Sequence, residues 1–317
     1  MPDALFHAYE SLFIWIGLGV LLFRILPNQV PRLLGRSLFW VGMPVEIFAL
    51  ARRTDFSKLV WLAPTATICT LLMGLGLALS FLQLSQRWPQ DWLGLQSETH
   101  KGSFVLSAML GNTGFVGLAI AASILNPDNL GLAAFFTVMH NAMGLYGAGV
   151  LVADHFGERE QGDEPSHRPW WKSLLAVVKV PSLWAFLLGA STQSVAFSEV
   201  AEVTLQKSIW VVIPCGFLLM GMRLSQLKNL RSLACGVVPA FIKVVLMPTM
   251  IALITPFLGI VGEPRLALVL MAGTPTALTA LVLAEEYNLD RELIASSIAL
   301  SMLALIPLVP LWLALLA

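Results

Sequence analysis

The chain alternates between long apolar stretches and short polar connections. An α-helix needs about 20 mainly apolar residues to cross a lipid bilayer, and ten stretches approach or exceed that length. We expect membrane-spanning helices near residues 4–26, 30–51, 58–84, 101–125, 128–153, 172–192, 206–224, 229–257, 265–287 and 289–316. The pattern therefore predicts an all-α polytopic membrane protein with ten transmembrane helices.

Two of these stretches carry glycine, proline and polar residues at their centres. The fourth contains the run Gly-Asn-Thr-Gly-Phe-Val-Gly at residues 111–117, and the ninth contains Thr-Pro-Thr at residues 274–276. One constant shift lays Asn112, Thr113 and Gly114 on Thr274, Pro275 and Thr276. The lipid interior has no water to satisfy freed backbone groups, so two interruptions at matching places predict two deliberately broken helices around a binding site.

The chemistry of the two breaks favours an anion. We expect half-helices to start near Gly114 and near Thr276, with Thr274 as an N-cap before Pro275. Each start directs unpaired N–H groups and the positive end of a helix dipole toward mid-depth. A carboxylate or another small anion suits such a position better than a cation.

A charged stretch divides the chain into two halves. We interpret residues 1–153 as a first repeat (helices 1–5), residues 154–171 as a linker, and residues 172–317 as a second repeat (helices 6–10). An odd number of helices in each half predicts that the repeats are inverted with respect to each other. Lys and Arg are more numerous on the side of the linker, which predicts a cytoplasmic linker and two extracytoplasmic termini.

Composition narrows the function further. Hydrophobic residues make up 57% of the chain and charged residues only 12%, and the formal net charge is zero, so a nucleic-acid partner is not indicated. The three cysteines show no paired spacing, which predicts neither disulfides nor a metal site. Metalloprotease, nucleotide-loop and serine-hydrolase motifs are absent from the sequence, and we expect no enzyme activity and no cofactor.

A few polar side chains are predicted within the membrane. His140 and Asn141 fall at the centre of the fifth stretch, Lys243 at the centre of the eighth, and Glu46 toward the outer end of the second. A charge at the bilayer centre costs at least about 2.5 kcal/mol, so Lys243 is expected to face a partner or a cavity. We take Lys243 as a substrate ligand and His140, Lys243 and Glu46 as candidates for proton coupling. The alternatives are a neutral His140 that packs in the interior with one hydrogen bond, a structural pairing of Lys243, and a pairing or snorkelling role for Glu46.

Four acidic residues near helix ends are interpreted as structural. Asp128 and Asp290 stand where N-caps of the fifth and tenth helices are expected. Glu285 and Glu286 close the inner end of the ninth helix.

The interrupted stretches resemble a known family. Residues 112–118 resemble the NTGFMGLP signature of the auxin efflux carrier family, and the tail from Pro275 through Glu285-Glu286-Tyr287 to Pro307 resembles its closing block. The resemblance implies an inverted five-plus-five fold similar to that of bile-acid symporters and sodium/proton antiporters, with helices 1, 2, 6 and 7 as a scaffold domain and helices 3–5 and 8–10 as a moving transport domain.

The resemblance also implies a site. Helices 4 and 9 would cross at their breaks, and a small carboxylate such as malate, or an auxin-like weak acid, would bind beside the crossing. The matching positions are Asn112, Thr113, Gly114, Gly117, Asn141, Thr274, Pro275 and Thr276. Ala119 stands where the family has proline, so we expect a less sharply broken fourth helix.

The function expected is secondary transport of a small organic anion across the plasma (inner) membrane by alternating, elevator-like movement. A homodimer through the scaffold is a further expectation. The sequence leaves open the substrate, the direction and the coupling ion. The alternatives are a cation/proton antiporter or sodium symporter on the same fold, and, from another class, a non-transporting membrane sensor or scaffold protein.

Overall fold

The computed structural model describes residues 2–27, 29–53, 61–87, 95, 97–161, 181–225 and 233–316. Within these ranges, side-chain burial is described from residue 13 onward, except at residues 127–128 and 158–161. Residues 162–171 of the predicted linker lie outside the description, as do the first residues of the predicted third, sixth and eighth helices. Among the described residues all regular structure is helical.

The first part of the chain forms α1 (Pro2–Phe23), α2 (Val30–Ser37), η1 (Leu38–Gly42), α3 (Met43–Ala51), α4 (Leu62–Ser85), α5 (Glu98–Met109), η2 (Thr113–Gly117), α6 (Leu118–Ile124), α7 (Pro127–Met139), η3 (His140–Gly149) and α8 (Val150–Gln161). The second part forms α10 (Pro181–Ser191), α11 (Glu199–Leu224), α12 (Leu233–Phe241), η5 (Ile242–Leu246), α13 (Met247–Ile254), η6 (Thr255–Leu258), α14 (Glu263–Ala272), α15 (Leu278–Glu286) and α16 (Arg291–Leu316). The η segments are π-helical turns within longer helices, except η6, which is a 3-10 turn.

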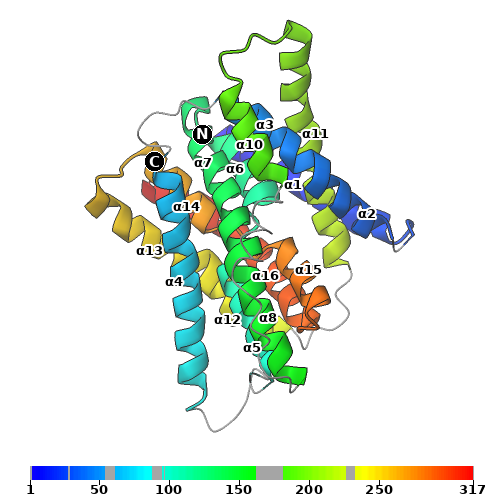
Figure 1. Cartoon of the computed structure of the whole chain (residues 1–317), viewed down its shortest axis with the longest axis vertical. Coiled ribbons are helices and arrows are strands. Elements are labelled where there is room, and N and C mark those ends of the chain that lie inside the picture. The colour runs from blue at the N-terminus through cyan, green and yellow to red at the C-terminus, as the bar shows by residue number, and fades with distance from the viewer. Residues whose placement is uncertain are drawn as a thin grey trace.

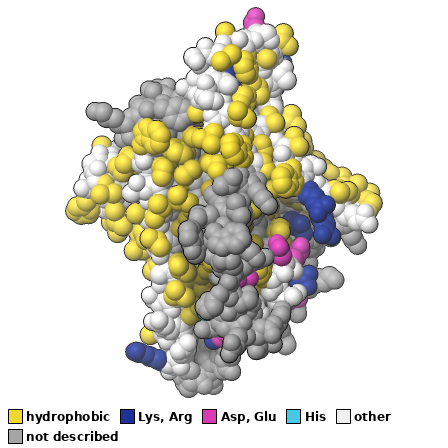
Figure 2. Space-filling model, in the orientation of Figure 1, with side chains coloured by type: hydrophobic (Ala, Val, Ile, Leu, Met, Phe, Trp, Pro, Cys, Tyr) yellow, Lys and Arg dark blue, Asp and Glu magenta, His cyan; other side chains and the backbone are white. Residues whose placement is uncertain are grey.

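Six described helical segments are long and apolar enough to cross a membrane: Val30–Ala51, Leu62–Ser85, Asn129–Gly157, Glu199–Leu224, Leu233–Leu258 and Arg291–Leu316. Large apolar side chains on their surfaces are left uncovered, including Trp210, which is 79% exposed. Figure 2 shows hydrophobic side chains over much of the visible face. Such a surface is stable only against lipid, and the chain is a multi-pass membrane protein.

Two helix boundaries differ most from the predicted ranges. The helix α11 begins at Glu199, several residues before the predicted start, because Ser198 Oγ caps it by accepting from the N–H of Ala201 at 3.3 Å. The helix α8 runs to Gln161, so residues 154–161 of the predicted linker continue the preceding helix.

The helices pack in two sets of neighbours (Figure 1). In one set α1 packs on α11, and α3 packs on both α10 and α11. In the other, α5 contacts α4, α8 and α16, while α12 packs on α16 and α14 packs on α7. The α1–α11 contact is especially close, since a β-carbon at Gly19 or Gly221 would collide with a carbonyl oxygen of the facing helix.

Candidate functional site

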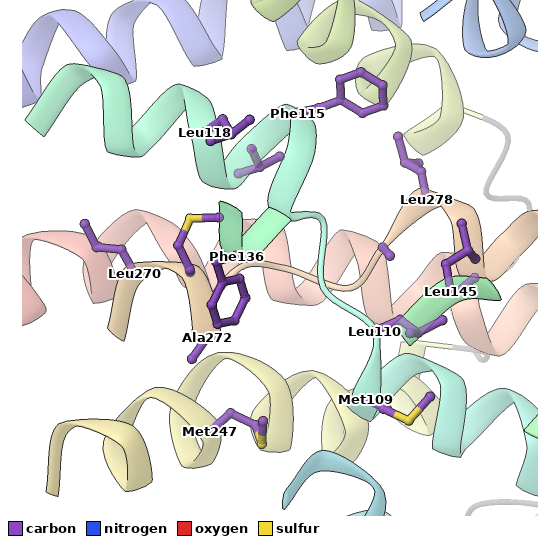
Figure 3. Packing of buried hydrophobic residues seen from close by; sticks show 14 of the residues in the cluster. Met109, Leu110, Phe115, Leu118, Phe136, Leu145, Met247, Leu270, Ala272 and Leu278 are labelled. Carbon is purple, nitrogen blue, oxygen red and sulfur yellow. The ribbon is translucent and has the colours of Figure 1, made fainter. Parts of the chain in front are cut away.

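The two predicted interruptions are present, and they meet. The helices α5 and α14 end at Met109 and Ala272, and the extended segments that follow run antiparallel, with Gly111 opposite Thr276. The N–H of Asn112 donates to the Pro275 carbonyl oxygen at 2.7 Å, and the N–H of Ala277 donates to that of Leu110 at 3.0 Å. Figure 3 shows the two segments crossing. Each break thus satisfies backbone groups freed by the other, which an apolar environment requires.

Residues in and around this crossing start two new helical segments. The segment η2 starts at Thr113, and Asn112 caps it, since Asn112 Oδ1 accepts from the N–H of Phe115 at 3.3 Å. The helix α15 starts at Leu278, with Ala277 as its N-cap residue. Both starts lie close to the predicted positions.

The predicted N-cap role of Thr274 is wrong. Its hydroxyl donates to the Met271 carbonyl oxygen at 3.0 Å, at the end of α14. Pro275 belongs to the extended segment, because its carbonyl group is the acceptor for Asn112. The interruption lies upstream of Ala119: Leu110 has an extended backbone, and Ala119 sits inside α6.

Small residues allow the segments to approach. A β-carbon at Gly117 would lie 2.8 Å from Thr274 Cγ2, and one at Gly114 would collide with Met43 Cε. Thr276 ties the crossing to its neighbours, with its N–H donating to Ser301 Oγ and its hydroxyl donating to the Ser107 carbonyl oxygen, both at 3.0 Å. The predicted motif residues therefore form one packed unit.

Two ionisable side chains reach the crossing from other helices. His140 Nε2 accepts from the N–H of Gly111 at 3.4 Å, and its ring stacks on Phe136. Lys243, only 2% exposed, donates from Nζ to the Ala272 carbonyl oxygen at 2.6 Å. The ammonium group therefore lies at the end of α14, where helix carbonyl groups are unpaired and the helix dipole is negative.

The remaining predicted residues are buried nearby or in an adjacent helix. Asn141 is buried in η3, next to His140. Glu46 is buried in α3, and its Oε1 has no hydrogen-bond partner in the described part of the chain. Lys243 therefore bonds to a backbone carbonyl and not to Glu46.

Two polar atoms of the motif have unused hydrogen-bonding capacity. Asn112 Nδ2 and Thr113 Oγ1 are buried and have no partner among the described groups. Buried polar groups are nearly always satisfied, and an unsatisfied one in a native site is commonly completed by a ligand or water. The free amide donor of Asn112 is suited to an acceptor such as a carboxylate oxygen.

A cavity of about 570 Å³ lies beside the crossing. Its apolar wall includes Phe115 and Leu278, from the first turns after the two breaks, together with Phe39, Trp40 and Leu145. Its charged lining consists of Arg32, Arg36, Arg223, Glu285 and Glu286. From the sequence, the three arginines were not predicted as site residues, and Glu285 and Glu286 were interpreted as structural. The only signal was the spacing of Arg32 and Arg36, which puts both on one face of a helix.

Polar contacts outside the apolar segments join helix ends. Asp290 is the N-cap of α16, as predicted, because its Oδ1 accepts from the N–H of Leu293 at 2.9 Å. Asp128 is not an N-cap, since α7 starts at Pro127 and Asn126 occupies the cap position. Partial burial raises the pKa of Glu263, but hydrogen bonds from Asn126 and Asn129 outweigh that effect and hold the pKa below its usual value.

A multi-pass membrane protein with two broken helices that meet beside a cavity has the architecture of a membrane transport protein. The profile of the family described as membrane transport protein, the auxin efflux carrier family, matches residues 11–313, and the chain belongs to this family. Membership of a transporter family indicates that the protein moves a substrate across the membrane and does not act as an enzyme.

Two archaeal relatives cover nearly the whole chain. An uncharacterized transporter of Methanothermobacter thermautotrophicus is 28% identical over 309 residues, which span 95% of each chain. An uncharacterized transporter of Methanocaldococcus jannaschii is 22% identical over 309 residues, which span 95% of this chain and 94% of the relative. The similarity therefore extends over the helices on both sides of the crossing.

Proposed function

We propose that the protein is a secondary transporter that moves a small organic anion across the plasma membrane by alternating access. The observation that carries the proposal is the crossing, where two helical starts meet beside a cavity and the buried amide of Asn112 keeps a free donor. Helix starts and free N–H donors favour an anion. The ammonium group of Lys243, fixed at the end of α14, adds positive charge to the same place.

The proposed architecture has ten membrane helices in two inverted repeats, with helices 1, 2, 6 and 7 as a scaffold and the others as an elevator-like transport domain. The packing of α1 and α3 on α11, and of α10 on α3, supports a scaffold of this composition. In Figure 1 both ends of the chain lie toward one end of the long axis, and the end of α8 lies toward the other. That placement supports opposite sides of the membrane for the termini and the linker, and the excess of Lys and Arg on the linker side favours the cytoplasm for the linker. Homodimerisation through the scaffold belongs to the same proposal.

Each residue of the crossing has a proposed role. Asn112 and Thr113 offer hydrogen bonds to the anion, while Gly114 and Gly117 permit close packing of the broken helix. Thr274, Pro275 and Thr276 hold the second break in its extended form, and Asn141 completes the polar surroundings. His140 and Lys243 are the ionisable groups at the crossing, and with Glu46 they are the proposed carriers of any coupled proton.

Flux measurements test the proposal. Purified protein in liposomes is to be assayed with a panel of mono- and dicarboxylates, together with the variants Asn112→Leu and Thr274→Val. Each variant removes polar groups with little change in volume, and we expect transport to fall at least about tenfold, the effect of losing one or two hydrogen bonds. Thr204→Val, at an exposed position of α11, is the matched control. Parental rates in both crossing variants would exclude the crossing as the site.

The membrane orientation has its own test. A single cysteine at position 162, in a variant that lacks the three native cysteines, should resist a membrane-impermeant maleimide added to intact cells. A cysteine added after Ala317 should react. Labelling of position 162 from outside would reverse the proposed orientation without affecting the transport proposal.

A further inference from the structure

We propose that Arg32, Arg36 and Arg223 form an anion-capture site at the mouth of the cavity, distinct from the crossing. The site takes the carboxylate or sulfonate group of an organic anion with an apolar body, before that anion reaches the crossing. The inference rests on the proposed transport of an organic anion and assigns it a second binding position.

The arginines of α2 face the cavity because of their spacing. Gly35 and Arg36 follow Arg32 by three and four residues, so both lie on the same face of the helix as Arg32. All three line the cavity, and Phe39 and Trp40 of η1 continue the same wall. Arg32 and Arg36 are exposed, which places them where the cavity meets solvent.

Arg223 brings a third guanidinium group from α11. Its side chain is half-buried. The guanidinium group is attracted by Glu285 and repelled by Arg32. Arg223 therefore lines the cavity between an acidic group on α15 and a like charge on α2. Repulsion between like charges is relieved when an anion binds between them, and such an anion gains charge-assisted hydrogen bonds from the guanidinium forks.

The charged groups lie at the opposite end of the cavity from the crossing. Leu278 is in the first turn of α15 and Glu285 is in its last turn, about 10 Å further along at 1.5 Å per residue. Between these ends the lining is largely apolar, with Phe39, Trp40 and Leu145. An anion held at the arginines therefore places an apolar body against the aromatic wall and its charge near the mouth. Figure 2 shows Lys and Arg side chains gathered close to Asp and Glu side chains on the right of the molecule.

A simpler role for these arginines is to fix the orientation of the helices in the membrane. Lysine serves orientation as well as arginine does, because the rule counts positive charge. Capture by a guanidinium fork does not accept lysine equally, because lysine offers a single point charge. The two roles therefore predict different results for Lys and Gln substitutions.

Binding of anilinonaphthalene sulfonate, an aromatic anion whose fluorescence rises in apolar surroundings, tests the site in the full-length protein. The protein is held in phosphatidylcholine nanodiscs, and empty nanodiscs give the background. We expect the Arg32→Gln/Arg36→Gln double variant to raise the Kd at least about tenfold, and the corresponding Lys variant to raise it less. The parent's Kd should also rise with salt.

Two further variants complete the test. Arg223→Gln should weaken probe binding by a factor similar to that of the double variant, whereas Arg24→Gln, an exposed arginine outside the cavity lining, should leave it unchanged. An unchanged Kd in both the double variant and Arg223→Gln would overturn the capture site. Arginine-dependent probe binding in a protein that moves no carboxylate would instead keep the site and contradict the transport proposal.

Discussion

The Phe115 side chain packs against α11 at Gly216, where the missing side chain leaves a notch. A β-carbon at Gly216 would lie 2.8 Å from Phe115 Cδ1 and 3.0 Å from its Cβ and Cγ. Phe115 belongs to the first turn after the break and also lines the cavity, and in Figure 3 it points away from the crossing. The ring therefore interlocks the crossing with α11, and sliding of one past the other must withdraw it from the notch.

We expect Gly216→Ala to slow transport by about tenfold, because overfilling a packed contact typically costs about 1–3 kcal/mol. Phe115→Leu in the same chain should restore part of the rate by vacating the space. Gly76→Ala is the control, since a β-carbon there meets nothing within 4 Å. Initial rates in liposomes decide the matter, and a double variant as slow as Gly216→Ala would contradict the interlock.

The crossing could be predicted from the sequence because a broken membrane helix has an unusual composition. Glycine, proline and amide residues seldom gather at the centre of an unbroken membrane helix, which makes Asn112 and Pro275 conspicuous. The hydrogen bond between them could not be predicted from the residue types alone. The cap predicted at Thr274 was consequently wrong. The cavity arginines could not be found, because nothing in the sequence of α2 specifies that it faces α11 and α15. Local signals reveal exceptions to a pattern, whereas packing partners depend on the whole fold.

The Asp290 carboxylate should contribute stability that depends on pH. Burial raises the pKa of Asp290, but hydrogen bonds from His100, at 2.7 Å, and from the N–H of Leu293 outweigh it and leave the pKa below its usual value. A lowered folded-state pKa gives stability that is present above the unfolded value of about 3.9 and is lost as pH falls through the folded value.

Asp290→Asn should therefore lower the free energy of unfolding near neutral pH by about 0.2–1 kcal/mol, the range of a partly exposed pair. The difference from the parent should shrink as the pH falls below the unfolded value of about 3.9, and it should vanish once Asp290 is protonated in the folded state. Asparagine keeps the N-cap, so Asp290→Ala should cost about 1 kcal/mol more at either pH. Thermal unfolding midpoints in detergent measure all three proteins. A constant difference between parent and Asp290→Asn across the range would show that the charge is not responsible.

Arg52 should stabilise the contact between α3 and the connection from α10 to α11. Its guanidinium group donates to Glu202 Oε1 and to the carbonyl oxygens of Thr192 and Val195, and its Cζ lies 3.7 Å from the centre of the Phe197 ring. We expect Arg52→Met to lower the free energy of unfolding by about 2–3 kcal/mol, because it leaves a carboxylate and two carbonyl groups without their donor.

Arg52→Lys should lie between the parent and Arg52→Met, since an ammonium group replaces only part of the fork. Neither Arg52 nor its partners line the cavity, so the KM for transport should not change. Thermal unfolding and KM are to be measured on the same preparations. A normal midpoint for Arg52→Met, or a raised KM with a normal midpoint, would contradict a structural role.

Lys243 provides the most direct test of an anion site at the crossing. Its Nζ donates to the Ala272 carbonyl oxygen at 2.6 Å, and a β-carbon at Gly111 would lie 2.9 Å from the same Nζ. The positive charge is therefore held against both breaks at once. The described residues provide it with a backbone carbonyl as partner but no carboxylate, so the charge remains available to a bound anion.

Lys243→Met should fold and insert, because two effects on stability oppose each other. Removal of a buried charge relieves a penalty of at least about 2.5 kcal/mol, and loss of the donor to Ala272 costs about 1–3 kcal/mol. Anion binding has no such compensation, and we expect the affinity for the transported carboxylate to fall at least about tenfold, the effect of one charge-assisted hydrogen bond. Lys207→Met, at an exposed position of α11, removes the same charge away from the crossing and should bind normally. Calorimetric titration of the three proteins with the transported carboxylate separates the cases. Equal affinity in Lys243→Met and the parent would mean that the ammonium group serves only the end of α14, and that the helix starts alone attract the anion.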